Sequence, residues 1–160
     1  MIRSIAFILP IAFIPGAFAQ AATSCPWLTT GSAAKILGGD VTPMVRTSGN
    51  WEGFCRFTRQ TGEAVETLEI LVGKSDTHSC PDGSLKLKAI GNEAVQCKRS
   101  IATGQEIYTI AGRVRNVYFA VTLTNVAGAI LDQSAEVRPA DPYSASPLER
   151  LAEQVSGNLY

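Results

Sequence analysis

Alternating apolar and polar residues predict several β-strands in the middle of the chain. The alternation is clearest in Val117–Thr124, where Val117, Phe119, Val121 and Leu123 would line one face. The predicted strands are residues 41–46, 51–59, 65–72, 85–90, 93–98, 107–112 and 117–124. Turn residues such as Gly, Pro, Asn and Asp separate consecutive strands, so we expect a mainly antiparallel sheet.

Two helices are predicted, one at each end of the strand region. Thr29 or Thr30 would cap the first helix, and Gly38-Gly39 would end it. The second begins at Ser146-Pro147-Leu148-Glu149, a capping box with proline at the first helical position. Its apolar residues recur at helical spacing: Leu148, Leu151, Ala152, Val155 and Leu159. This order predicts an α+β fold, a mainly antiparallel sheet with the N- and C-terminal helices packed on one face.

The first residues of the chain, 1–19, are typical of a secretory signal peptide. Arg3 supplies a positive charge, the apolar run Ser4–Ile14 follows, and Ala17-Phe18-Ala19 matches a cleavage site. A membrane anchor is disfavoured because the run is interrupted by prolines and is shorter than the roughly 20 apolar residues that a span needs. We therefore expect cleavage after Ala19, which leaves residues 20–160 as a single exported domain, periplasmic or secreted.

The overall composition excludes several classes of protein. Hydrophobic residues make up 46% and charged residues 18%, as in globular domains rather than disordered chains. The 14 basic and 14 acidic residues give a net charge of zero, which argues against nucleic-acid binding. Residues 126–145 have no clear period and contain Pro139 and Pro142, so we expect a long loop there.

The cysteines Cys25, Cys55, Cys80 and Cys97 favour two disulfides in an exported chain. Four cysteines allow three connectivities, and spacing alone does not choose among them. We favour Cys25–Cys55 and Cys80–Cys97 because each bond then closes a local stretch. Zinc binding is the first alternative, but the chain has no C-x-x-C and a single histidine, His78. Lipidation of Cys25 is the second, but it would leave three thiols.

No catalytic, cofactor-binding or metal-binding arrangement emerges from the sequence. The nucleophile elbow, the phosphate-binding loop and the dinucleotide motif are all missing. A Ser-His-Asp set would have to use His78, for which an exposed loop position is the simpler interpretation. Glu63, Glu66 and Glu69 are three residues apart, but on a strand Glu66 and Glu69 would face opposite sides.

Basic and aromatic residues are weaker candidates for ligand contacts. A basic patch for an anionic ligand could gather from Lys86, Lys88, Lys98, Arg99, Arg113 and Arg115. Solvated strand residues are the simpler interpretation of this set. Trp27 and Trp51 lie next to cysteine-bearing segments, and we expect both to pack against the disulfide and the core.

Several short motifs occur in a fixed order along the chain. They are Cys25-Pro26-Trp27-Leu28-Thr29 before a short helix, Cys55-Arg56-Phe57, Gly91-Asn92-Glu93-Ala94, the segment Gly112–Phe119 and the closing Leu151–Tyr160. Together they resemble small bacterial exported proteins of unknown function, which include secreted and lipoprotein domains. The resemblance implies an α+β fold and the pairing of Cys25 with Cys55, and it implies no activity. Lipoprotein members carry a lipidated cysteine ahead of the domain, whereas no cysteine precedes Cys25 here.

Taken together, these patterns predict a non-enzymatic binding module of the bacterial envelope. Its partner would be an envelope protein or another component of the envelope. The alternative is a small-ligand carrier or sensor with a pocket between the sheet and the helices. An enzyme with an unrecognised site is a third hypothesis. We expect a monomer with no cofactor, no membrane span and no nucleic-acid partner.

Overall fold

A computed structural model of the chain describes residues 24–49, 51–76, 80–81, 84–101, 104–126 and 146–160. The predicted signal peptide, residues 1–19, lies outside these residues. So do His78 and residues 127–145 of the predicted long loop. In the part of the chain that is described, no helix is both long enough and apolar enough to cross a bilayer.

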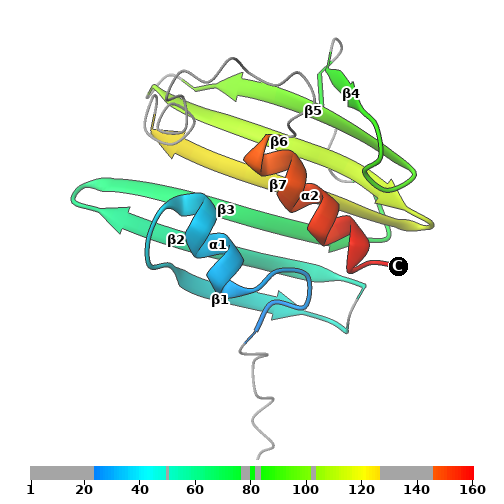
Figure 1. Cartoon of the computed structure of the whole chain (residues 1–160), viewed down its shortest axis with the longest axis horizontal. Coiled ribbons are helices and arrows are strands. Elements are labelled where there is room, and N and C mark those ends of the chain that lie inside the picture. The colour runs from blue at the N-terminus through cyan, green and yellow to red at the C-terminus, as the bar shows by residue number, and fades with distance from the viewer. Residues whose placement is uncertain (1–23, 50, 77–79, 82–83, 102–103, 127–145) are drawn as a thin grey trace, which may run out of the picture.

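The described strands form one seven-stranded antiparallel sheet (Figure 1). In chain order they are β1 (Thr42–Thr47), β2 (Gly53–Thr61), β3 (Ala64–Gly73), β4 (Leu85–Leu87), β5 (Glu93–Ser100), β6 (Gln105–Val114) and β7 (Val117–Val126). Their order across the sheet is β1-β2-β3-β7-β6-β5-β4. The chain therefore builds one edge, crosses to the other edge after β3, and returns inward to β7. The antiparallel α+β architecture predicted from the alternation is confirmed.

β4 is shorter than the predicted strand 85–90. It ends at Leu87, and Ala89 and Gly91 follow with φ angles of 65° and 60°. This left-handed backbone cannot continue an extended strand. Gly91 also approaches β6 closely, because a Cβ atom there would lie 2.6 Å from the carbonyl oxygen of Arg113.

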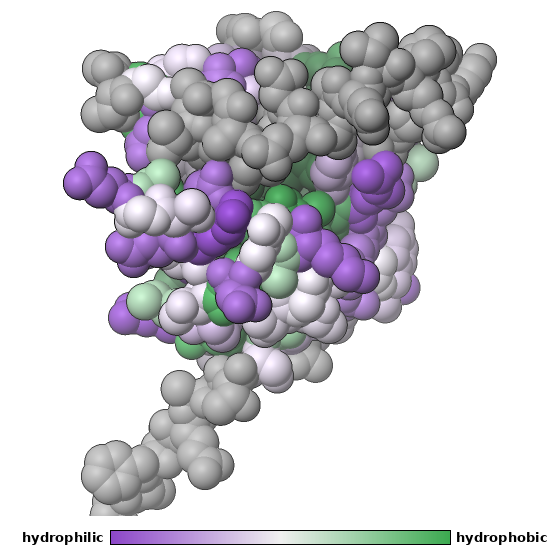
Figure 2. Space-filling view, turned by 60° about the vertical axis from the view of Figure 1, so that its left-hand side comes forward, coloured by the Kyte–Doolittle hydropathy of each residue, from purple (hydrophilic) through white to green (hydrophobic). Residues whose placement is uncertain are grey.

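One face of the sheet, which we call the inner face, carries the core. Across the sheet Cys55 pairs with Ile70, Ile70 with Val121, and Val121 with Ile110. All four side chains are fully buried. The predicted alternation is thus confirmed in the central strands. Seen from the side of the β2–β3 turn, the surface is mainly hydrophilic, and hydrophobic residues show chiefly in a recess (Figure 2).

Two helices flank the strands in the described chain, α1 (Thr30–Leu37) and α2 (Pro147–Gly157). α1 lies over β2 and β3, and α2 lies over β6 and β7 (Figure 1). The first contributes Ala33 and Leu37 to the core, and the second contributes Leu148, Leu151, Ala152 and Val155. Each fully buried leucine side chain contributes about 1.5–3 kcal/mol to stability.

Both helices begin where the sequence predicts. The Thr29 hydroxyl oxygen accepts a hydrogen bond from the Ser32 N–H at 3.1 Å. The Ser146 hydroxyl oxygen accepts one from the Glu149 N–H at 3.2 Å. Such N-caps contribute about 1 kcal/mol each. Gly38 ends α1 in the left-handed conformation, with φ at 73°.

Two disulfides join Cys25 to Cys55 and Cys80 to Cys97, and this confirms the pairing favoured from the sequence. Their Cα–Cα separations are 5.9 and 5.7 Å. The first bond ties the entry segment to the core, because Cys55 is fully buried. The second ties the crossover between β3 and β4 to β5.

The two tryptophans lie in different surroundings. Trp27 is 1% exposed, and its carbonyl oxygen accepts a hydrogen bond from the Asn158 side-chain amide at 3.0 Å. This bond joins the segment before α1 to the end of α2. Trp51 is 45% exposed, so the prediction that it packs in the core is wrong. Trp51 lies in the connection between β1 and β2, outside the strands whose side chains form the core.

Candidate binding surface

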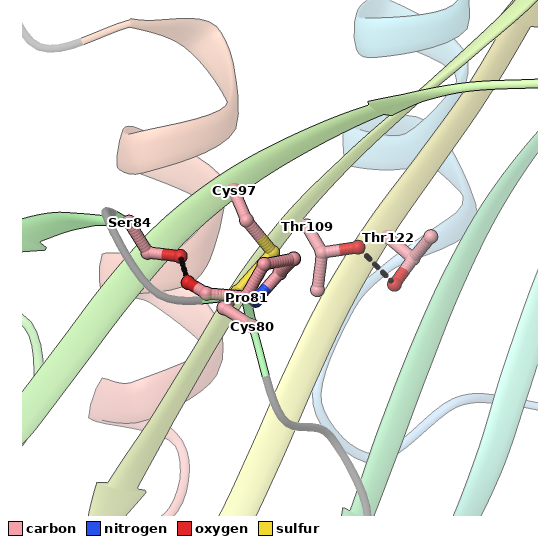
Figure 3. The surroundings of a disulfide bond; sticks show 6 residues. All are labelled: Cys80, Pro81, Ser84, Cys97, Thr109 and Thr122. Atoms are coloured by element: carbon pink, nitrogen blue, oxygen red, sulfur yellow. Dashed lines mark hydrogen bonds between the residues drawn. A yellow bond between two sulfur atoms is a disulfide. The ribbon is translucent and has the colours of Figure 1, made fainter.

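The opposite face of the sheet, which we call the outer face, carries polar side chains that pair across strands. Arg56 and Glu69 are direct partners in the β2–β3 register and form an ion pair. The hydroxyl oxygens of Thr109 and Thr122, partners in β6 and β7, lie 3.2 Å apart in a hydrogen bond (Figure 3). Cross-strand pairs of this kind contribute about 0.2–1 kcal/mol each. These four side chains in the middle of the outer face therefore find their polar partners within the sheet.

The second disulfide holds the β3–β4 crossover against the outer face. Cys97 is the partner of Thr109 in the β5–β6 register, so both side chains lie on this face (Figure 3). Cys80 bonds to Cys97 from the crossover. The Ser84 hydroxyl donates a 2.5 Å hydrogen bond to the carbonyl oxygen of Pro81, which orders the chain before β4.

Two hollows open at one end of the outer face, beside the segment that follows β3. The larger, of about 460 Å³, lies over β4 to β7, and its polar lining residues are Asp76, Lys86, Asn92, Glu93, Arg113 and Tyr118. The other, of about 400 Å³, lies over β1 to β3 and is lined in part by Arg46, Glu52, Phe54, Leu71 and Lys74. Both volumes fall within the range of binding pockets, roughly 300–1,000 Å³.

An ion pair lines the larger hollow. Glu93 and Arg113 are direct partners in the β5–β6 register, and their closest N–O distance is 2.7 Å. The hydrogen bond that the Arg113 guanidinium donates to Glu93 raises the pKa of Arg113. Lys86 lines the same hollow and has no ion-pair partner among the described residues.

The Gly91-Asn92 motif holds the β6–β7 turn against β5. The Asn92 backbone N–H donates to the carbonyl oxygen of Arg113 at 2.7 Å. Its side-chain oxygen accepts from the backbone N–H of Arg115 at 2.5 Å. Gly91 leaves room for this approach, since a Cβ atom would collide with Arg113. This part of the motif therefore has a structural role at the rim of the larger hollow.

The basic residues named from the sequence do not form one patch. Lys98 and Arg99 are consecutive in β5 and so face opposite sides of the sheet. Lys86 and Arg113 line the larger hollow. The guanidinium of Arg115 lies 5.6 Å from the centre of the Tyr160 ring, at the end of the chain.

Lys98 belongs to a separate polar cluster with Glu106 and Tyr108. Its ammonium lies 2.6 Å from one Glu106 carboxylate oxygen, and the Tyr108 hydroxyl donates to the other at 2.5 Å. The hydrogen bond from Lys98, followed by that from Tyr108, lowers the pKa of Glu106. The same bond to Glu106 is the main cause of the raised pKa of Lys98. The cluster links β5 to β6 and lines neither hollow.

Glu66 and Glu69 face opposite sides of the sheet, as the spacing predicts. Glu66 is only 5% exposed and pairs with Arg59 at 3.2 Å. The predicted three-residue turn Thr61–Glu63 did not reveal this buried pair, because Arg59 and Glu66 lie two and three residues from its ends. They become direct partners because Thr61 pairs with Ala64, which leaves only Gly62 and Glu63 in the turn.

Known proteins add no assignment to this surface. Comparison with protein-family models, with curated proteins and with solved structures finds no match to the chain. Within the described residues, no group of three or more His, Cys, Asp or Glu side chains could hold a metal ion. The candidate surface is therefore defined by its geometry, charge and burial.

Proposed function

We propose that this chain is an exported, non-catalytic binding module of the bacterial envelope, and that it engages a partner protein through the outer face. The observation that carries the proposal is the contrast between the two faces of the sheet. Among the described residues, buried core side chains cover the inner face, whereas hollows of about 460 and 400 Å³ open on the outer face. Concave surfaces with a few polar groups are the usual binding sites of small ligands, and surface grooves also bind extended segments of partner proteins.

We infer that both helices cover the inner face. Ala33 and Leu37 from α1, and Leu151 and Val155 from α2, belong to the same buried cluster as the inner-face strand residues. None of these four side chains is more than 3% exposed. Such packing supports a site on the outer face rather than the alternative, a ligand pocket between the sheet and the helices.

The pairing of the acidic residues supports a non-catalytic role. Each of four glutamates has a basic partner: Glu66 with Arg59, Glu69 with Arg56, Glu93 with Arg113, and Glu106 with Lys98. Three of the four pairs join residues that face each other across adjacent strands. Cross-strand pairing of this kind stabilises a sheet. Acid–base catalysis by two carboxyl groups instead needs environments that push their pKa values apart.

Two disulfides support the proposed export, because such bonds persist in oxidising compartments. In this account the signal peptide is removed after Ala19, and the exported monomer begins at Gln20. The intact mass of the protein recovered from the envelope tests this point. A mass starting at another residue, or one retaining free thiols, would contradict it.

Site-specific photo-crosslinking in the native host tests the proposed function. A photoreactive residue replaces Met44, which is exposed on the outer face, or Glu153, which is exposed on α2. We expect a discrete protein adduct from position 44 and none from position 153. An adduct from position 153 alone, or no adduct from either position, would contradict the proposal. An increase in mass from a small bound molecule would instead favour the ligand-carrier alternative.

A further inference from the structure

The two hollows belong to one groove along the end of the outer face. A narrow hollow of about 10 Å³ lies between them, with room for roughly one water molecule. It shares Leu71, Gly73 and Ser75 with the 400 Å³ hollow. It shares Asp76 and Tyr118 with the 460 Å³ hollow. The groove therefore runs beside the segment that follows β3, from one half of the sheet to the other.

The strand register gives the groove its direction and length. One row of outer-face residues crosses all the strands, from Arg46 in β1 through Phe54, Leu71 and Ala111 to Lys86 in β4. Six strand spacings of about 4.8 Å separate its ends, or roughly 29 Å. About nine residues of extended peptide span that length at 3.4 Å each.

The charges along the groove favour an acidic occupant. Arg46, Lys74 and Lys86 are exposed, and none of the three has an ion-pair partner among the described residues. Arg46 and Lys86 stand near the two ends, and Lys74 follows β3 between them. Two carboxylates, Glu52 and Asp76, also line the groove outside the Glu93–Arg113 pair. Outside that pair three cations stand against two carboxylates, so the lining has a small net positive charge.

The floor of the groove favours an occupant that also has apolar side chains. Phe54, Leu71, Val95 and Tyr118 are half-buried there, and Ala111 is buried among them. An extended peptide points alternate side chains to opposite sides, so apolar residues can face the floor while acidic residues reach Arg46 and Lys86 at the ends and Lys74 between them. Polyuronates and polyphosphates carry the charge but lack these apolar groups.

We infer that the groove binds an extended segment of a partner protein in which acidic and apolar residues alternate. This inference rests on the proposed function and adds the chemistry of the partner. It predicts that charge and apolar character are both required for binding. Electrostatic attraction at an exposed rim weakens as salt is added, so the affinity should fall with ionic strength.

Fluorescence anisotropy with labelled peptide pools tests the inference. The probe is a pool of capped nonapeptides in which Asp or Glu alternates with Leu, Phe, Val or Tyr. Matched pools carry Lys or Arg, or Ser or Thr, in place of the acidic residues. Sodium polygalacturonate serves as the rival polyanion. We expect the full disulfide-bonded chain to bind the acidic pool at least roughly tenfold more tightly than either matched pool.

Charge-reversal variants locate the binding. The double variant Arg46→Glu, Lys86→Glu should weaken binding of the acidic pool by roughly tenfold or more. Arg99→Glu is the matched control. Arg99 is an exposed cation of β5 that lies on the outer face, as Arg46 and Lys86 do, but it lines neither hollow. Arg99→Glu should change the affinity less than twofold. Near-UV circular dichroism checks that each variant keeps its fold.

Three results would overturn the inference. They are equal binding of the acidic and basic pools, equal weakening by Arg99→Glu, and binding of polygalacturonate in preference to peptides. The proposed function can survive each of them. A photo-crosslink from position 44 without acidic-peptide binding would keep the outer face as the interface and reject only this partner chemistry.

Discussion

Arg59 donates a 3.2 Å hydrogen bond to Glu66, its direct partner across β2 and β3. The same nitrogen, Nη1, also donates to the carbonyl oxygen of Leu37 at 2.6 Å. Leu37 is the last residue of α1, so its carbonyl oxygen accepts no hydrogen bond from within the helix. One guanidinium therefore neutralises a carboxylate that is 5% exposed and fixes the end of α1 to the sheet.

Replacing Arg59 with Met should destabilise the fold by about 2–3 kcal/mol, because it leaves the Glu66 carboxylate buried without a partner. We expect a smaller loss than for a fully buried ion pair, because the Arg59 side chain is 27% exposed and solvent partly screens the pair. The double variant Arg59→Met, Glu66→Met should recover most of the loss, since no buried charge remains. Urea unfolding of the wild type and both variants measures these differences.

The Arg56–Glu69 pair provides a matched control for this prediction. It joins the same two strands on the outer face, and both side chains are more than a third exposed. Arg56→Met should cost no more than about 1 kcal/mol, because solvent screens exposed ion pairs. Equal losses from Arg56→Met and Arg59→Met would show that burial does not set the strength of these pairs.

The Cys80–Cys97 disulfide should stabilise the fold although it lies on the outer face. Replacing both cysteines with Ser should cost roughly 2–5 kcal/mol, because the bond restricts the unfolded chain. The native protein should also contain no thiol that reacts with Ellman's reagent after denaturation without reductant. Reactive thiols in that assay, or an unchanged urea midpoint for the double variant, would contradict this account.

The Lys98–Glu106–Tyr108 cluster predicts a pH dependence of stability. Because the folded state lowers the pKa of Glu106 below its ordinary value of 4.5, its contribution is present above that value and is lost as the pH falls through the folded pKa. Glu106→Gln should therefore be less stable than the wild type near neutral pH, and the difference should shrink in acid. Urea midpoints of both proteins across this range provide the measurement. A difference that is constant with pH would contradict a charge-based role.

Gly112 and Gly31 should respond in opposite ways to replacement by Ala. A Cβ atom at Gly112 would lie 2.7 Å from both the carbonyl oxygen of Glu93 and the Phe119 ring. Gly112→Ala should therefore cost about 1–3 kcal/mol. Gly31 lies in α1 with nothing within 4 Å of such an atom, so Gly31→Ala should stabilise by about 0.4–1 kcal/mol. Thermal unfolding of the two variants checks both signs.

Much of the fold was predictable because its signals are local. Alternation placed Val121 and Leu123 in the core, and the Ser146 capping box placed the start of α2. The adjacency of β3 and β7 was not predictable, because it joins segments far apart in the chain and depends on which edge the crossover reaches. Trp51 was misplaced because proximity to Cys55 in sequence does not show that a turn residue lies beyond the sheet.

The candidate surface was less predictable than the fold. Lys86 and Arg113 were both named as basic residues, but the sequence did not show that they line one hollow. No sequence pattern indicated that Arg46, Phe54 and Lys74 contribute to a binding surface. Arg46 and Phe54 lie together because the β1–β2 register makes them partners, and Lys74 joins them from the segment after β3. A one-residue slip in the register would send alternate side chains to the other face.

Hydroxyl-radical footprinting tests the central claim, binding through the outer face, most directly. The protein in its native envelope fraction is compared with the purified protein, and oxidation is read residue by residue. Met44 on the outer face is 47% exposed, and Tyr160 after α2 is 62% exposed, so both react when free. We predict that Met44 and Phe54 are protected in the envelope fraction while Tyr160 stays reactive. Protection of Tyr160 with Met44 and Phe54 still reactive would contradict the account.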